Sequence, residues 1–358
     1  MGTKGTVPAT LDAISAEWLA EALDLPIDSI DVDVIGAGEG FLGQLARVHL
    51  TSDDPAAPDS VIVKLPTVDP GARMIGEMMR VWEREHRFYA ELASQMQIRV
   101  PRAYVNVGEP TPCLVMEDLS PARPGDHVQG ATLDQAERAV DALAQHHATW
   151  FQHPMLDTLD WMPGLDDPQV LTIPDTFAMG WPMFLERFGD DLAPRTMRWC
   201  ERFVQHVPEW LDGHLNDPIT LTHGDYRLDN LFFDDDGSVS VIDWQMAMKV
   251  PGQADFVYFC ANNLTTEMRR THERDLLERY VAGLHAGGVP SDVITVDSVW
   301  QGYLEGLVFY AVSFGASLLT IDPANERGVR LFEALVHRTF AAVDDLAAGL
   351  ALGYDPDG

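Results

Sequence analysis

The chain has 358 residues, 46% of them apolar, which is enough for a substantial hydrophobic core and excludes global disorder. It carries 24 basic and 56 acidic residues, for a formal net charge of −32 at pH 7. A field of this sign repels nucleic-acid phosphates and anionic lipids, so we expect no nucleic acid and no membrane as partner.

Cysteine spacing and hydropathy indicate the cellular compartment of the protein. The three cysteines, Cys113, Cys200 and Cys260, are far apart and show no metal-ligand spacing, which is typical of a reducing compartment. The first 20 residues lack the apolar segment of a secretion signal. The longest largely apolar stretch, 307–321, is shorter than the roughly 20 residues that a membrane-spanning helix needs. We expect a soluble, cytoplasmic protein with no obligate protein partner.

The first part of the chain has the pattern of a small sheet with one main helix. A short helix is predicted over 11–24, and apolar alternation or apolar runs predict five strands, at 30–35, 44–50, 61–65, 103–107 and 113–116. A helical period between Gly71 and Ala93 places one apolar stripe on that segment. The stripe comprises Met74, Met78, Val81, Trp82, Phe88, Tyr89 and Leu92.

The remainder of the chain is mostly helical by periodicity. Thr132 and Gln135 resemble a capping box that opens a helix ending near Phe151. Further helices are predicted over 175–211, 266–286, 298–319 and 327–346. One hairpin interrupts them, with strands at 228–233 and 239–242 joined by an Asp-Gly turn. The composition changes near 117–124, so we expect a domain boundary between residues 118 and 119.

The strongest chemical signal surrounds this hairpin. Asp225 and Asn230 lie five residues apart on the segment His223–Asn230, which leads into the first strand, and Asp243 follows the second strand. Because a hairpin returns its ends to the same place, three oxygen-bearing side chains can converge there. Such oxygen ligands suit Mg²⁺ with nucleotide phosphates, and protein kinases use the same spacing. The alternative is three polar residues that cap turns, which the full spacing disfavours.

A glycine-rich segment lies between the first two predicted strands. Gly38, Gly40 and Gly43 form a GxGxxG pattern that leads into a strand rather than a helix. This arrangement lets backbone N–H groups cover nucleotide phosphates, and glycine permits the close approach. An ordinary glycine-rich hairpin turn fits the pattern equally well.

One lysine and one glutamate stand out against apolar surroundings. Lys64 is the only charged residue of the strand 61–65, and Glu85 falls on the apolar stripe of the following helix. A carboxylate on a buried face needs a cation, and Lys64 is the candidate. Each residue alone also fits a structural role, Lys64 as an edge-strand charge and Glu85 as a solvated residue at the stripe's margin.

These residues together resemble a known group of enzymes. The pattern HGDxxxxN…IDW, with Lys64 and Glu85, is similar to the aminoglycoside phosphotransferase and choline kinase superfamily. The segments Glu85-x-x-Phe88-Tyr89, Leu114–Leu119 and Leu143-Ala144-x-x-His147-Ala148 resemble the ecdysteroid-kinase-like branch. The resemblance runs from about residue 36 to 260.

The resemblance implies an α+β, two-lobed protein-kinase-like fold. The N-terminal lobe, 1–118, would hold ATP with its antiparallel sheet, and the helical C-terminal lobe, 119–358, would bind a small hydroxylated acceptor. By position, Asp225 would be the catalytic base, and Asn230 and Asp243 would hold Mg²⁺. Nucleotide contacts would come from the lobe's strands, helix, glycine segment and hinge: Lys64, Glu85, Gly38, Gly40, Gly43, Met116, Glu117 and Leu119.

Departures from the family pattern narrow the function. Arg227-Leu228-Asp229 replaces the His-Pro-Gly common in antibiotic kinases, which argues against an aminoglycoside acceptor. No long activation loop follows Asp243, which argues against a protein substrate. We expect an ATP- and Mg²⁺-dependent kinase that transfers phosphate to a small-molecule hydroxyl, either an apolar alcohol or an amine-bearing cation. The alternatives are a catalytically silent nucleotide-binding pseudokinase and a hydrolase that binds a transition metal through His223 and Asp225.

Overall fold

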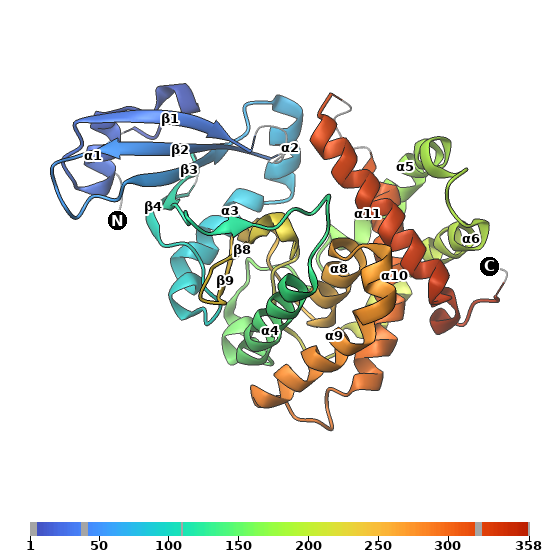
Figure 1. Ribbon diagram of the computed structural model, residues 1–358. Coiled ribbons are helices and arrows are strands. Elements are labelled where there is room, and N and C mark those ends of the chain that lie inside the picture. Colours follow the sequence, from blue (N-terminus) through green and yellow to red (C-terminus); the bar gives the residue numbers. More distant parts are fainter. Residues whose placement is uncertain (1–5, 37–41, 109, 319–323, 357–358) are drawn as a thin grey trace. The chain divides into compact units, whose positions relative to one another are not determined.

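The computed structural model describes residues 6–36, 42–108, 110–318 and 324–356 (Figure 1). The chain forms two compact units. The first comprises Met1–Arg123 and Ser240–Met246, and the second comprises Pro124–Val239 and Ala247–Gly358. The segment that carries Asp243 therefore belongs to the first unit, although it lies in the second half of the sequence.

An antiparallel five-stranded sheet with the order β1-β2-β3-β5-β4 forms the first unit (Figure 1). Its core contains inward-facing residues of the sheet together with Trp18 and Leu19 of α1 (Ala16–Leu23). The strands are β1 (Ser29–Ile35), β2 (Gly43–Thr51), β3 (Ser60–Pro66), β4 (Ala103–Val107) and β5 (Cys113–Glu117), each close to its predicted position.

The single helix predicted over 71–93 is wrong. The segment forms α2 (Pro70–Met78) and α3 (Val81–Arg87), and then a π-helical turn, Phe88–Leu92. Arg80, with a φ of 53°, adopts the left-handed conformation that separates the two helices. Met74 and Met78 are each 67% exposed, so the apolar stripe begins only at Val81.

The second unit is a cluster of helices (Figure 1). α10 packs against α5, α8 and α11, and α4 packs along α9. The predicted capping box at Thr132 and Gln135 opens α4 and is confirmed. The helices are α4 (Leu133–Trp150), α5 (Ile173–Phe188), α6 (Pro194–Phe203), α7 (Val207–His214), α8 (Gln253–Asn263), α9 (Thr266–Ala286), α10 (Val296–Ser317) and α11 (Glu326–Asp345).

The continuous helix predicted over 175–211 is also wrong. The chain leaves the helix after Phe188 and starts again twice, with a proline in the first turn of α6 and of α7. Proline lacks the N–H that a helix interior needs, but it fits the first turn. The apolar spacing alone did not reveal these restarts.

Short strands frame the segment that carries Asp225. β7 (Thr220–Thr222) pairs with β10 (Met248–Val250), and β8 (Leu231–Phe233) and β9 (Val239–Val241) flank the predicted Asp-Gly turn. Leu228–Asn230, predicted as strand, is a 3₁₀ turn. β6 (Arg123–Pro124) spans the end of the first unit.

The described elements confirm the predicted α+β class, with an antiparallel sheet in the N-terminal unit and helices in the other. Over the described ranges, every helix is too short or too polar to cross a bilayer.

Candidate active site

Three charged side chains meet inside the first unit. Lys64 lies on β3, where it is opposite Leu45 of β2 and Leu114 of β5. Its ammonium nitrogen donates to Oε1 of Glu85 and to Oδ1 of Asp243, each over 2.8 Å. Lys64 is 9% exposed and Glu85 is 2% exposed, so most of this contact is shielded from water. Glu85 therefore contacts Lys64, the cation predicted as its partner.

Burial acts on both members of this pair. It lowers the pKa of Lys64, but the carboxylates of Asp243 and Glu85 outweigh it, and the pKa is raised above the usual lysine value. Burial also raises the pKa of Glu85, against the opposing effect of the Lys64 charge. The cluster contains one cation and two carboxyl groups. Because both carboxyl groups depend on the same cation, the electrostatic balance of the cluster requires Lys64.

Asp243 is held by an unusual backbone conformation and by its neighbour. Its φ of 65° lies in the left-handed region, which Asp tolerates better than most residues. Trp244 is fully buried and stacks on Phe88, with ring centroids 4.4 Å apart, and its indole N–H donates to the carbonyl of Val241 over 3.2 Å. The buried ring anchors the turn that presents the Asp243 carboxylate to Lys64.

The other predicted nucleotide contacts lie on or next to the same sheet. Gly43 begins β2, and a Cβ built there would lie 3.6 Å from Cε of Lys64. Gly38 and Gly40 lie outside the described residues. Met116 and Leu119 are each 7% exposed, and Glu117 accepts hydrogen bonds from Arg99 and from the N–H of Arg102.

In the second unit, the Asp225 carboxylate accepts three side-chain hydrogen bonds. Tyr258 of α8 donates to Oδ1 over 2.9 Å. Arg227 and Asn230 donate to Oδ2, each over 3.1 Å. The Asn230 amide also donates to the Asp225 carbonyl over 2.9 Å. The side chain keeps 21% exposure, so the carboxylate is fixed in orientation yet open to a ligand.

A buried carboxylate holds the loop that carries Asp225. Asp255 accepts from the backbone N–H groups of His223 over 2.6 Å and of Gly224 over 2.9 Å. Gly224 has a φ of 77°, a conformation in which glycine is free of strain. His147 Nε2 lies 3.2 Å from the same carboxylate. The Asp255 carboxylate therefore ties down this loop.

His223 takes part in this scaffold. It is fully buried, and its Nδ1 accepts the backbone N–H of Asp225 over 3.2 Å. Within the described ranges, no three His, Cys, Asp or Glu side chains gather as a metal site.

Two residues that contact Asp225 or the nearby Asp229 were missed by sequence reasoning. Tyr258 is a single tyrosine in an apolar helix, which is most simply interpreted as core. Arg327, at the start of α11, lies 3.3 Å from Oδ1 of Asp229. No local pattern links a residue to one that is 98 positions away.

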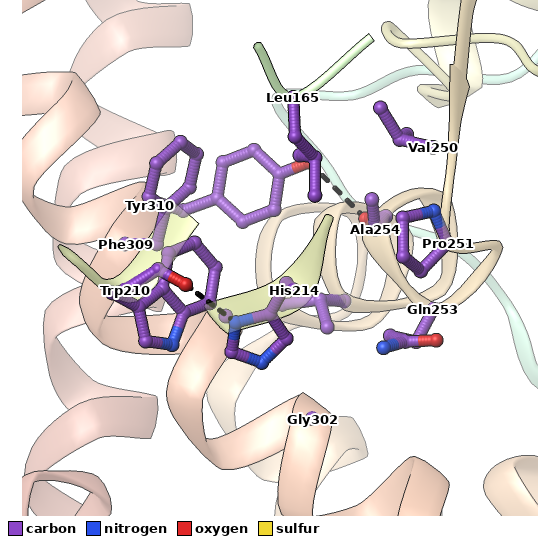
Figure 2. A pocket seen from close by; sticks show the side chains of 12 residues that line it. Leu165, Trp210, His214, Val250, Pro251, Gln253, Ala254, Gly302, Phe309 and Tyr310 are labelled. Carbon is purple, nitrogen blue, oxygen red and sulfur yellow. Dashed lines mark hydrogen bonds between the residues drawn. The ribbon is translucent and has the colours of Figure 1, made fainter. Parts of the chain in front are cut away.

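The second unit also contains an apolar pocket of about 80 Å³ (Figure 2). Trp210, Phe309 and Tyr310 provide aromatic walls, and Leu165 and Val257 also line the pocket. The Tyr310 hydroxyl donates to the Ala254 carbonyl over 3.2 Å, which leaves the ring as the group that lines the pocket (Figure 2). Aromatic residues of α7 and α10 therefore border this cavity.

A comparison with models of protein families finds one match. The model of the phosphotransferase enzyme family matches residues 47–291, more than half of the chain. The chain belongs to the phosphotransferase enzyme family. The match includes Lys64, Glu85, Asp225, Asn230 and Asp243. Among curated proteins, no sequence matches this chain.

Solved structures of family-like enzymes share the fold. A choline kinase from Cryptosporidium parvum Iowa II is 11% identical with a TM-score of 0.56, covering 90% of this chain and 92% of that one. A type I macrolide 2'-phosphotransferase is 16% identical with a TM-score of 0.54, covering 87% and 94%. Spectinomycin phosphotransferase, solved with ADP and spectinomycin, is 15% identical with a TM-score of 0.54, covering 92% and 97%. These similarities confirm the predicted protein-kinase-like fold.

Proposed function

We propose that this family member is a small-molecule kinase that transfers the γ-phosphoryl group of ATP to a hydroxyl group. The observation that carries the proposal is the Asp225 carboxylate, fixed by three donors on a loop that Asp255 anchors. A fixed, partly open carboxylate suits a base that orients an acceptor hydroxyl and accepts its proton. The Lys64 ammonium, held by Glu85, supports a nucleotide-phosphate contact in the first unit.

In the proposed reaction, the acceptor oxygen attacks the γ-phosphorus and its proton passes to Asp225. The bond between the γ-phosphorus and the bridging oxygen breaks, and ADP leaves with that electron pair. Because the transition state is loose, positioning and charge neutralisation supply most of the rate enhancement. Arg227 is one cation at the Asp225 carboxylate, 3.1 Å from Oδ2.

We propose Asn230 and Asp243 as ligands of Mg²⁺. An amide oxygen and a carboxylate are hard donors of the type that Mg²⁺ prefers. The Asn230 amide nitrogen is turned toward Asp225, so its oxygen is the end available to a metal. When bound, the ion would neutralise charge that develops on the phosphates.

The proposal also assigns a binding role to each part of the chain and a branch of the family to the protein. Residues 1–118 would bind nucleotide through the glycine segment and the hinge Met116–Leu119, and residues 119–358 would bind the acceptor. The motif Glu85-x-x-Phe88-Tyr89 supports placement in the ecdysteroid-kinase-like branch, and the contact of Glu85 with Lys64 gives the motif's first residue a physical role.

A thermal-shift titration with ATP, with and without Mg²⁺, tests the proposal. We expect a stabilisation that requires Mg²⁺ in the wild type and in Asp235→Ala, an exposed turn control, and that is lost in Asp243→Asn. Asn keeps the left-handed conformation accessible, so the variant removes charge with little strain. Stabilisation without any transfer to alcohols would favour the pseudokinase, and no stabilisation would contradict nucleotide binding.

A further inference from the structure

The Asp229 carboxylate, four residues after Asp225, joins two guanidinium groups. Arg227 lies 3.3 Å from its Oδ2, and Arg327 lies 3.3 Å from its Oδ1. Oδ1 also accepts the backbone N–H of His127 over 3.0 Å. Because the Asp229 side chain is only 9% exposed, water and salt screen these contacts weakly. The carboxylate is therefore held in one position from several sides.

Arg227 connects this carboxylate to the candidate active site. Its Nε donates to Oδ2 of Asp225 over 3.1 Å, and its Nη1 donates to Oδ2 of Asp229 over 3.3 Å. A guanidinium group is planar and rigid, so a contact at one nitrogen restricts the direction of the N–H at another. Asp229 thus restrains the group that donates to Asp225.

Helix α11 supports Asp229 from a distant part of the sequence. Arg327 lies in the first turn of α11, 98 positions from Asp229. Further along the helix, the buried Arg338 donates to three backbone carbonyl oxygens, those of His127, Val128 and Asn262. The helix is therefore fixed to the same segment whose N–H contacts Asp229. Arg327 reaches Asp229 from an element that is itself anchored, which makes its support rigid.

Two carboxylates compete for the Arg227 guanidinium group. Its contacts with Asp225 and Asp229 have similar lengths, 3.1 and 3.3 Å. Arg327 provides Asp229 with a second cation, which reduces the attraction of Asp229 for Arg227. Without Arg327, Asp229 would attract Arg227 more strongly, and the contact between Arg227 and Asp225 would weaken.

We infer that Arg327 and Asp229 are positioning residues that act through Arg227 to hold the Asp225 carboxylate in the orientation needed for the acceptor hydroxyl. The inference rests on the proposed function for the role of Asp225. The chain of contacts from Arg327 to Asp225 lies within the second unit and can be tested without a substrate.

The Nε–H of Arg227 reports on this chain of contacts. Its exchange with solvent is measured by ¹⁵N NMR on the full chain without nucleotide, and its signal is assigned by its loss in Arg227→Lys. Arg327→Gln should speed the exchange about tenfold, because the contact with Asp225 weakens. Arg327→Lys keeps the charge and should restore slow exchange.

Arg330→Gln is the matched control, since this arginine is exposed on the same helix. It should leave the exchange of the Arg227 Nε–H unchanged. The inference would be overturned by unchanged exchange in Arg327→Gln, or by equally fast exchange in Arg330→Gln, which would indicate a general loosening of α11.

A double variant tests whether Arg327 acts through Asp229. Asp229→Asn should also speed the exchange of the Arg227 Nε–H, and the addition of Arg327→Gln should then change it little further. Additive effects of the two substitutions would contradict the chain of contacts.

Transfer from ATP to an alcohol is assayed separately. In Arg327→Gln, kcat should fall about tenfold while the KM for ATP keeps its value. An unchanged kcat despite faster exchange would overturn the positioning role. If the wild type transfers no phosphate but the NMR results are as expected, the proposed function fails and the chain of contacts stands.

Discussion

The Tyr258 hydroxyl donates to Oδ1 of Asp225 over 2.9 Å, while Arg227 and Asn230, which donate to Oδ2, belong to the loop that follows Asp225. The two carboxylate oxygens therefore have different surroundings. One faces helix α8 and the other faces its own loop. This asymmetry fixes the plane of the carboxylate, which the proposed acceptor hydroxyl would have to approach.

Tyr258→Phe should lower kcat more than it changes the KM for ATP. The substitution keeps the ring and removes one hydrogen bond to a charged group, worth about 1.5 to 3 kcal/mol. Steady-state kinetics of ATP turnover with an accepted alcohol measure the two constants. Tyr354→Phe, far along the chain at its C-terminal segment, is the control. An unchanged kcat would show that Arg227 and Asn230 suffice to hold Asp225.

Lys64→Met should destabilise the first unit strongly. Glu85 and Asp243 would lose the cation they share, and breaking such a buried pair costs about 3 to 5 kcal/mol. Adding Glu85→Gln should recover part of the loss, because no uncompensated charge then remains at the 2% exposed position. Urea unfolding of the single and double variants measures the free energies. A double variant that is no more stable than Lys64→Met would contradict the argument.

Asp118 should contribute stability that is lost in acid. Burial opposes its ionisation, but hydrogen bonds from Arg47, Ser60 and Ser120 lower its pKa from 3.8 to about 2. Because the folded-state pKa is the lower one, the contribution is present above pH ~4 and disappears as the pH falls through about 2. Asp118→Asn should remove about 1 to 2 kcal/mol at pH 7, after allowance for solvent screening.

The check on Asp118 is a series of unfolding measurements between neutral pH and pH ~2. The wild type should lose stability relative to Asp118→Asn as the pH falls, until the two converge. Asp53→Asn, at an exposed turn of the same unit, should follow the wild type. A constant difference between the wild type and Asp118→Asn at all pH values would contradict the linkage.

Asp255→Asn should loosen the loop that presents Asp225. The backbone N–H groups of His223 and Gly224 would lose a charged acceptor, and each such hydrogen bond is worth about 1.5 to 3 kcal/mol. Hydrogen exchange should accelerate at these two amides, and turnover should fall. Asp275→Asn, exposed on α9, should leave both unchanged. Unchanged exchange in Asp255→Asn would show that other contacts fix the loop.

The sequence predicts those elements whose pattern is local. The capping box at Thr132, the strands of the first unit and the hairpin turn at Gly237 depend on residues a few positions apart. Such patterns do not reveal unusual backbone conformations. Periodicity predicts one continuous helix, but the left-handed conformation of Arg80 divides it into two. Contacts between distant segments escape as well, as with Arg327 and Asp229, because one sequence contains no signal for them.

The site shows the same division. Three separate features predict three residues: a lone charge in an apolar strand predicts Lys64, an apolar helical stripe predicts Glu85, and the hairpin motif predicts Asp243. In the structure these residues form one hydrogen-bonded cluster. Tyr258 contacts the Asp225 carboxylate and packs beside Tyr310, and the positions of both residues follow from how α8 and α10 pack. A tyrosine in an apolar helix looks like core until its hydroxyl is placed.

The contact between Lys64 and Asp243 makes the ammonium group an internal substitute for a divalent ion. Any cation that binds Oδ1 of Asp243 must first displace, or share that oxygen with, a lysine already 2.8 Å away. Without a ligand, the Lys64 ammonium group therefore already occupies the position of a cation at the Asp243 carboxylate. We therefore expect weak metal binding to Asp243 in the absence of nucleotide. A nucleotide phosphate that binds Lys64 would draw the ammonium group away and make the Asp243 carboxylate available to the metal.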